Sequence, residues 1–166
     1  MMETTTSGRK ATVSLPADNQ ILIEREFDAP KDLVYRAYTT PELVKRWYHA
    51  NRGEVTVTEI DLRVGGKWRY AMVADGMEIA FHGEYREIVP NERLVATEAF
   101  EGAEADYPSE ATVNTATFDE KDGKTTLRIL VEAPSKEIRD AIIDSGMEAG
   151  LQDALALLEE TARSLR

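Results

Sequence analysis

Apolar and polar side chains alternate over residues 21–27, and this alternation predicts a β-strand because successive strand residues point to opposite faces. Pro30 ends the pattern and fits the first turn of a helix, where its missing N–H has no partner to lose. Apolar residues then recur at helical spacing over residues 33–38. A second short helix begins at Thr40, a suitable N-cap, and reaches Trp47. This part of the chain therefore predicts one strand and two short helices.

The middle of the chain predicts an antiparallel sheet whose strands are joined by tight turns. Asp75-Gly76 and Asp122-Gly123 predict two-residue hairpin turns, because both positions tolerate a positive φ. The acidic residues 101–108 predict a loop. Between these signals, alternating segments predict about six strands, over residues 55–61, 68–72, 77–89, 93–100, 112–118 and 125–132.

After Pro134 the period changes, because apolar residues recur three and four positions apart up to Ala162. This pattern predicts one long helix with Ser135 as its N-cap, and ~29 residues at ~1.5 Å each make a rod of ~43 Å. Gly146 and Gly150 would share one face of this helix, where each costs ~1 kcal/mol relative to alanine. We expect close packing against the sheet there; an opening into a cavity and a kink at Gly146 are the alternatives.

The order of the predicted elements indicates an α+β domain, in which the helices are segregated from the sheet. Residues 20–166 make up this domain, and a chain of 166 residues has a suitable length for a single one. Residues 1–19 are rich in small polar residues and predict a loosely ordered N-terminal arm. Within the arm, residues 12–15 have the pattern of a short edge strand.

The composition excludes several kinds of chemistry. The chain has no cysteine, which excludes disulfides, a thiol nucleophile and thiolate zinc sites. With two histidines, any metal site would depend on carboxylates, and we expect neither a metal nor a cofactor. The sequence also lacks a glycine-rich phosphate loop, a nucleophile elbow and a His-x-x-x-His pair, so it contains no recognisable catalytic motif.

The net charge of the chain limits the classes of binding partner that we expect. The net charge is −11 and is uneven: residues 1–83 carry 11 basic and 12 acidic side chains, whereas residues 84–166 carry 9 and 19. Because Lys and Arg supply most of the affinity for phosphates, we expect no nucleic-acid partner and no binding to a membrane surface. The sequence has no apolar stretch of ~20 residues and no signal peptide, which predicts a cytoplasmic protein.

Short motifs in a fixed order resemble one known family. They include REFDAP at residues 25–30, AYTTPEL at 37–43, DLRVGG at 61–66, GEY at 83–85, IVP at 88–90 and SGMEAG at 145–150. Together they resemble the bacterial branch of the family of activator of heat-shock protein 90 ATPase homologues, within the START-like (SRPBCC) superfamily, over about residues 10–164. At residues 48–50 the chain departs from the pattern, because Tyr-His-Ala stands where many relatives have Trp-Gly-Pro.

The resemblance implies a helix-grip fold, in which a curved antiparallel sheet of about six to seven strands wraps around the long C-terminal helix. It also implies an internal cavity between the sheet and that helix. Members of the superfamily hold lipids, polyketides, hormones and other apolar molecules in this cavity, and a few catalyse cyclisation or condensation there. The eukaryotic co-chaperone of the family also relies on a separate N-terminal domain, which we do not expect in this chain, so chaperone activation is disfavoured.

Large side chains of one parity are the candidates for the wall of such a cavity. Trp68, Tyr70 and Met72 share one strand face, and Phe81 and Tyr85 share a face of the next strand. Each alone is more typical of an ordinary core, but their aromatic and Met content, taken with the resemblance, makes ligand binding an equal alternative. The predicted ligand contacts are Trp47, Trp68, Tyr70, Met72, Phe81, Tyr85, Glu98, Asn114, Met147 and Leu151.

Polar residues near this wall are the weaker candidates. Glu98 has the parity of its apolar neighbours, which predicts a carboxylate on the inner face, and Asn114 is expected there on the next strand. A buried carboxylate has a raised pKa and is able to orient a ligand or to act as an acid or base. His82 has the opposite parity and is expected to face outward, and His49 is expected in an exposed loop.

We therefore predict that the protein binds a small to medium-sized apolar or aromatic molecule between its sheet and its long helix. One alternative is a cyclase- or aldolase-like enzyme with Glu98 or His49 as the acid–base residue. Another is a protein-interaction module whose acidic second half binds a basic partner. A homodimer is plausible, because members of the superfamily often self-associate. A dry cavity of ~300 Å³ would cost several kcal/mol at ~24 cal/mol per Å³, so we expect it to be filled, hydrated or partly collapsed.

Overall fold

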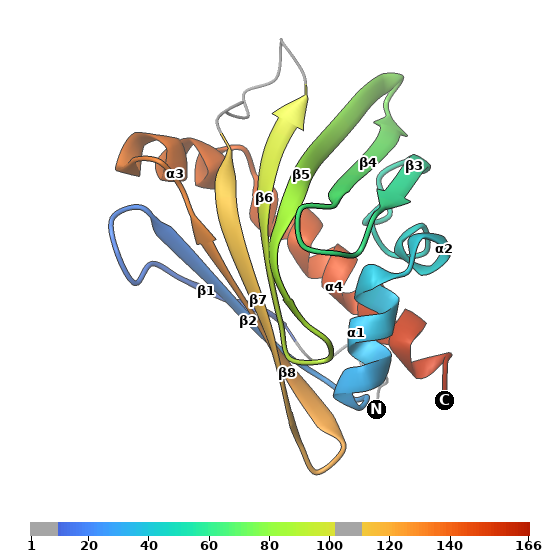
Figure 1. The fold of residues 1–166 in the computed structure, drawn as a ribbon. Coiled ribbons are helices and arrows are strands. Elements are labelled where there is room, and N and C mark those ends of the chain that lie inside the picture. Colours follow the sequence, from blue (N-terminus) through green and yellow to red (C-terminus); the bar gives the residue numbers. More distant parts are fainter. Residues whose placement is uncertain (1–9, 102–110) are drawn as a thin grey trace.

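The computed structural model describes residues 10–101 and 111–166. In these residues, eight strands form one antiparallel sheet in the order β1-β2-β8-β7-β6-β5-β4-β3. The strands are β1 (Thr12–Ser14), β2 (Gln20–Phe27), β3 (Glu54–Ile60), β4 (Lys67–Ala74), β5 (Met77–Val89), β6 (Arg93–Glu101), β7 (Thr112–Lys121) and β8 (Lys124–Glu132). The helices are α1 (Lys31–Thr39), α2 (Pro41–Val44), α3 (Lys136–Asp144) and α4 (Met147–Arg163). Figure 1 shows a strongly curved sheet, with α1 lying beside α4.

The α+β helix-grip prediction is confirmed, with a sheet that is slightly larger than expected. The described residues contain eight strands where the sequence predicts six to seven. One of them is β1, the short edge strand anticipated in the N-terminal segment, which pairs with β2 so that Val13 lies opposite Ile23. The division into an arm of residues 1–19 and a domain of residues 20–166 stays a prediction.

Both Asp-Gly pairs form the predicted hairpin turns. Asp75 and Gly76 have φ values of 52° and 77°, and Asp122 and Gly123 have values of 55° and 79°. This left-handed backbone at two consecutive residues is what a tight hairpin with the right strand twist requires. The turns fix the register of β4 on β5 and of β7 on β8, and thereby decide which side chains share a face.

The predicted long C-terminal helix is present as α4, but its expected continuity from Ser135 is wrong, because the chain is broken between α3 and α4. Ser135 is the N-cap as predicted, and its Oγ accepts a hydrogen bond from the backbone N–H of Ile138 at 3.2 Å. Gly146 has a φ of 84°, a left-handed conformation that interrupts a right-handed helix and suits glycine. The kink at Gly146, one of the alternatives drawn from the sequence, is therefore the correct one.

Gly146 and Gly150 do not form a shared helix face. Gly146 precedes α4 and is exposed, whereas Gly150 lies within α4. A Cβ at Gly150 would meet nothing nearer than Nε of Arg52 at 4.0 Å, so no strand of the sheet approaches this position closely. The expected close packing at these two glycines is therefore also wrong.

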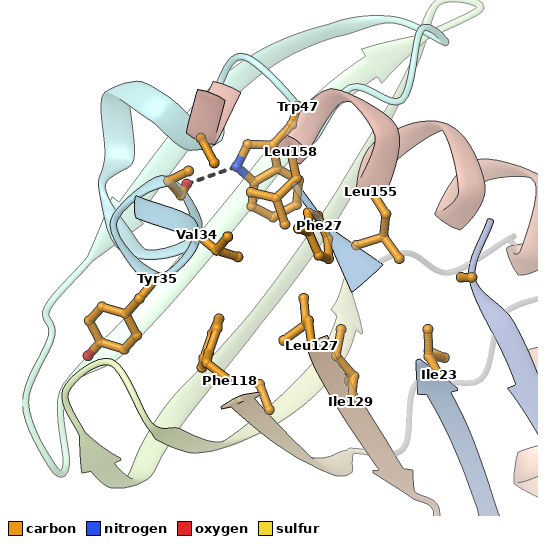
Figure 2. Packing of buried hydrophobic residues seen from close by; sticks show 14 of the residues in the cluster. Ile23, Phe27, Val34, Tyr35, Trp47, Phe118, Leu127, Ile129, Leu155 and Leu158 are labelled. Atoms are coloured by element: carbon orange, nitrogen blue, oxygen red, sulfur yellow. Dashed lines mark hydrogen bonds between the residues drawn. The ribbon is translucent and has the colours of Figure 1, made fainter. Parts of the chain in front are cut away.

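The hydrophobic core occupies the space between the sheet, α1 and α4. Figure 2 shows side chains from all three meeting there, among them Phe27, Phe118, Val34 and Leu158, which are completely buried. Trp47 joins the same cluster from the turn after α2, and its indole Nε1 donates a hydrogen bond to a backbone carbonyl of α1 at 2.9 Å. The core therefore fixes both short helices against α4.

A buried ion pair also joins α4 to the sheet. Arg25 on β2 and Glu159 on α4 are almost completely inaccessible to solvent, and Nη1 of Arg25 lies 2.8 Å from Oε1 of Glu159. The second oxygen of Glu159 accepts a hydrogen bond from the backbone N–H of Asp28 at 2.8 Å. Because a buried charge needs hydrogen-bonding partners on every side, this arrangement specifies how α4 sits on β2.

Candidate functional site

The large side chains predicted to line a cavity share the inner face of the sheet, which is the face toward α1 and α4. Tyr70 on β4 pairs with Phe81 on β5, and Phe81 pairs with Phe100 on β6. The rings of Phe81 and Phe100 lie with their centroids 5.2 Å apart. The same face carries three further predicted contacts, all buried: Trp68, Met72 and Tyr85. The shared parity read from the sequence therefore corresponds to one continuous surface.

A row of aromatic rings runs from α1 to β4 along this surface. Tyr38 on α1 stacks on Trp47 with ring centroids 5.7 Å apart. Trp47 contacts Tyr48 at 6.1 Å, and Tyr48 contacts Tyr70 at 4.9 Å, both in edge-to-face geometry. Trp68 extends the row at 4.8 Å from Tyr70. Such pairs are favourable because the positive edge of one ring meets the negative face of another.

Gly83 creates the space in which the Trp68 indole lies. A Cβ at Gly83 would be 2.6 Å from Nε1 of Trp68 and 1.7 Å from the carbonyl oxygen of Thr97. Without that Cβ, the indole Nε1 donates a hydrogen bond to this carbonyl at 3.1 Å. The Thr97 hydroxyl in turn accepts one from the backbone N–H of Glu84 at 3.0 Å. Trp68 is thus held in one orientation by its polar end, with its rings beside Tyr70 on the inner face.

Glu98 ends a short chain of hydrogen bonds on the inner face. The Thr112 hydroxyl donates to Oδ1 of Asn114 at 2.9 Å, and Nδ2 of Asn114 donates to Oε1 of Glu98 at 3.0 Å. Burial raises the pKa of the Glu98 carboxyl, and the hydrogen bond from Asn114 opposes that rise. The sequence placed Glu98 and Asn114 on this face, and the structure joins them directly.

Tyrosine hydroxyls add to the polar groups in this otherwise aromatic interior. Burial raises the pKa values of Tyr38, Tyr70 and Tyr85, and the nearby Glu98 carboxyl raises those of Tyr38 and Tyr70 further. Within the described residues, none of these three hydroxyls forms a hydrogen bond with the protein. The Tyr35 hydroxyl is completely buried and has no partner there either. The interior therefore contains several phenol O–H donors for which residues 10–101 and 111–166 supply no acceptor.

Comparison with family models identifies the chain. The model described as "Activator of Hsp90 ATPase homolog 1-like protein" matches residues 28–163, which is most of the sequence. The chain belongs to this family. The family lies in the SRPBCC superfamily, whose members typically bind ligands. Comparison with curated proteins gives no match.

Solved structures of bacterial proteins agree with this assignment to the activator of Hsp90 ATPase homolog 1-like family. Protein Ms6760 from Mycobacterium smegmatis is 25% identical with a TM-score of 0.80, and the match covers 90% of this chain and 95% of that one. Protein CV1439 from Chromobacterium violaceum is 30% identical with a TM-score of 0.72, covering 86% and 96%. A protein from Staphylococcus epidermidis is 29% identical with a TM-score of 0.78, covering 93% and 95%.

The turn after α2 contains a left-handed backbone conformation. Ala50 has a φ of 52°, which proline, restricted to a φ near −65°, is unable to adopt. Ala50 is buried, and His49 before it is half-buried, with its Nδ1 accepting a hydrogen bond from the backbone N–H of Asn51 at 2.9 Å. His49 therefore helps to shape this turn, and it is less exposed than the sequence suggests.

The remaining predicted contacts come from α4. Met147 and Leu151 are half-buried and pack against the core cluster of this family member. They lie one turn apart at the beginning of α4, directly after the break at Gly146. The structure thus places them on the helix that covers the inner face.

A recess of about 400 Å³ lies among outer-face side chains of β3 to β6 and also reaches Trp68 and Gly83. It is lined by Glu59, Lys67, Trp68, Arg69, His82, Gly83 and Glu101. Arg69 forms a two-pronged ion pair with Glu101, and Nδ1 of His82 lies 2.8 Å from the same carboxylate. Arg69 holds the pKa of Glu101 below its ordinary value. His82 is exposed and faces outward, as its parity in the sequence predicts.

Residues 10–101 and 111–166 contain neither a metal-binding cluster nor a membrane-spanning helix. No group of three or more His, Asp or Glu side chains in these ranges is arranged to hold a metal ion. None of the helices there is long and apolar enough to cross a lipid bilayer.

Three inner-face residues were missed by sequence reasoning. The sequence pattern places Tyr38 only in a helix and Thr112 only in a strand. Tyr48 stands in the segment that departs from the family pattern, and that departure was the one signal available for it. Their roles depend on ring contacts and hydrogen bonds between distant segments, which no local pattern records.

Proposed function

We propose that this protein binds a small to medium-sized apolar or aromatic molecule between the inner face of its sheet and helices α1 and α4. The observation that carries the proposal is the group of phenol hydroxyls within an aromatic interior, because they find no protein acceptor among the described residues. Buried polar groups in folded proteins are almost always hydrogen-bonded. A bound molecule, or water in its place, supplies the missing acceptors.

Energetics support a functional reason for these hydroxyls. A buried donor left unsatisfied costs ~1–3 kcal/mol, and phenylalanine would fill nearly the same volume without that cost. The completely buried hydroxyl of Tyr35 therefore reduces stability unless a bound molecule or water supplies its acceptor. The aromatic row from Tyr38 to Trp68 offers such a molecule flat faces and edges on which to stack.

Native mass spectrometry of the purified protein is the direct test. We expect a fraction of the protein to carry an additional mass that organic extraction releases as a small molecule. The variant Tyr70→Ala should lose that mass, whereas His82→Ala, on the outer face, should keep it. Repeated absence of any retained molecule, together with no thermal shift across a library of apolar compounds, would contradict the proposal.

A second candidate function is a cyclase- or aldolase-like reaction, and the environment of Glu98 is the observation that favours it. Its carboxyl lies on the inner face with a raised pKa and one oxygen fixed by Asn114. These are suitable properties for a general acid or base. The test is turnover of a polyketide-like or aromatic carbonyl compound, with a loss of at least about a hundredfold in kcat for Glu98→Gln. Unchanged kcat in that variant would exclude Glu98 as the acid–base residue.

A further inference from the structure

The hydrogen bonds around Glu98 present one of its oxygens to the interior. Thr112 donates to Asn114 and Asn114 donates to Oε1 of Glu98, so the chain of donors ends on this one atom. Within the described residues, Oε2 of Glu98 forms no hydrogen bond. That oxygen is the position at which a ligand group is able to contact the carboxyl.

In the part of the chain that the structure describes, no buried cation is left without an acceptor to receive an anionic ligand. Among the described residues, no lysine is buried, and the buried guanidinium groups are those of Arg25 and Arg139. Arg25 pairs with Glu159 at 2.8 Å. Arg139 lies on α3, where it pairs with Asp140 and donates to the carbonyl oxygen of Ala17. The charge that faces the aromatic interior is therefore that of Glu98, which is negative when it is ionised.

The other polar groups of the interior are hydrogen-bond donors. Tyr38, Tyr70 and Tyr85 each offer one phenol O–H, and the inner-face environment keeps these groups protonated. A neutral oxygen such as that of a ketone, ester, ether or alcohol accepts from such donors without bringing a charge next to Glu98. A carboxylate also accepts from them, but it brings a second negative charge into a region of low dielectric.

We propose that the ligand of the inner-face site is a neutral molecule with a hydrogen-bonding oxygen, and that the site excludes carboxylates such as free fatty acids. This inference rests on the proposed function, because it specifies the chemical class of the molecule that the same site binds. It follows from the donor set of the tyrosines, the open oxygen of Glu98 and the commitment of both buried guanidinium groups.

Two series of matched probes test the inference. One consists of 2-acetonaphthone, 2-naphthol and 2-naphthoate, and the other of methyl decanoate, decanol and decanoate. Binding is measured at about pH 7.5 by calorimetry and by quenching of the fluorescence of Trp47 and Trp68. In the series that fits the interior, we expect the neutral probes to bind at least about tenfold more tightly than the carboxylate.

Variants of the protein distinguish the effect of the Glu98 charge on probe binding from the effect of the shape of the site. Glu98→Gln removes the charge at nearly constant volume, so the carboxylate should gain affinity and the preference for neutral probes should shrink. Glu101→Gln, on the same strand but on the outer face, should leave the preference unchanged. Tyr70→Phe removes one donor, so the ketone should lose several-fold in affinity. Circular dichroism and thermal unfolding of each variant identify any that fail to fold, and Tyr70→Phe provides a second reading if Glu98→Gln does.

The possible results distinguish this inference from the function on which it rests. If a carboxylate binds as tightly as its neutral partners, or more tightly, the inference is overturned while ligand binding stands. A preference for neutral probes that persists unchanged in Glu98→Gln overturns the role given to Glu98. If no probe of either series binds and no retained molecule is found, the proposed function fails, and this inference fails with it.

Discussion

Glu159 and Glu98 both lie in low-dielectric surroundings, but the groups that donate hydrogen bonds to them differ. Glu159 faces a guanidinium group and a backbone N–H, so both of its oxygens are engaged by donors. Glu98 receives one hydrogen bond from a neutral amide, and burial raises its pKa. The first arrangement holds two elements together. The second leaves a titratable carboxyl with a raised pKa in the interior, as expected of a group that contacts a ligand.

The raised pKa of Glu98 predicts how stability changes with pH. The folded chain holds this proton at pH values where the unfolded chain, with a glutamate pKa of ~4.3, has lost it. Glu98 therefore lowers the free energy of unfolding as the pH rises from ~4.3 through its folded pKa. In urea unfolding between about pH 4 and pH 8, the stability of Glu98→Gln relative to the wild type should increase with pH and then level off.

The variant Glu101→Gln is the matched control for that series. Arg69 lowers the pKa of Glu101, so this carboxylate stabilises the fold above the ordinary glutamate pKa and loses that effect as the pH falls through the lowered value. Its replacement should therefore reduce relative stability as the pH rises, which is the opposite sign. A Glu98→Gln difference that stays flat or falls with rising pH would contradict the assignment.

The buried ion pair predicts a large effect at a single position. Glu159→Ala removes the carboxylate from Arg25 and leaves the backbone N–H of Asp28 without its acceptor. We expect a loss of ~3–5 kcal/mol in the free energy of unfolding, measured in urea. Glu160→Ala, one residue along and exposed, should change it by no more than ~0.5 kcal/mol. A loss below ~1 kcal/mol in Glu159→Ala would show that the pair contributes little to the docking of α4.

At the scale of the elements, the break between α3 and α4 is the main feature that local patterns do not determine. Apolar residues recur at helical spacing on both sides of it, so periodicity alone predicts a continuous helix. The two halves nevertheless differ in their main partners, since α3 lies on β2, whereas α4 lies along α1 and reaches β2 through Glu159. The left-handed conformation of Gly146 allows the axis to change between them.

Two glycine replacements of opposite sign test this account of the helices. In Gly146→Ala, a side chain is forced into a φ of 84°, which should cost ~1–2 kcal/mol. In Gly150→Ala, the new methyl group meets only Arg52 Nε at 4.0 Å, so better helix propensity should add up to ~1 kcal/mol. Thermal unfolding of the two variants should therefore shift in opposite directions. A stabilised Gly146→Ala would mean that the break is not required by the fold.

The sheet was predicted well because its signals are local. Asp75-Gly76 and Asp122-Gly123 set their turns, and strict alternation placed Glu98 and Asn114 on the inner face. The limit of such reasoning is visible in β3, where a bulge between Val55 and Val57 shifts the register and breaks the parity. Bulges and helix breaks depend on contacts with distant segments, as do the ring contacts of Tyr38 and Tyr48.

At the scale of the whole molecule, ligand binding and stability are linked. A molecule that binds only the folded state stabilises it by ~2.7 kcal/mol at a concentration of one hundred times its Kd. For a chain of this size that corresponds to a rise of ~5–10 °C in Tm. We expect a neutral aromatic probe that fits the interior to give such a rise in the wild type and a much smaller one in Tyr70→Ala.

The same measurement on His82→Ala controls for effects outside the interior. The His82 imidazole is exposed and pairs with Glu101 on the outer face, so the rise in Tm should match that of the wild type. Equal rises in all three proteins would place the probe elsewhere on the molecule. The family assignment would stand in that case, because it rests on the sequence and the fold.

The side-chain amide of Gln152 connects the two ends of the described chain. It accepts a hydrogen bond from the backbone N–H of Ala11 and donates one to the Ala11 carbonyl, each at 2.9 Å, across 141 residues of sequence. Ala11 directly precedes the shortest strand of the sheet, and Gln152 follows Leu151 on the helix over the inner face. Neither segment is able to move away without releasing the other. The rate at which the backbone amide proton of Ala11 exchanges with deuterium therefore reports how often the contact between α4 and this edge of the sheet opens.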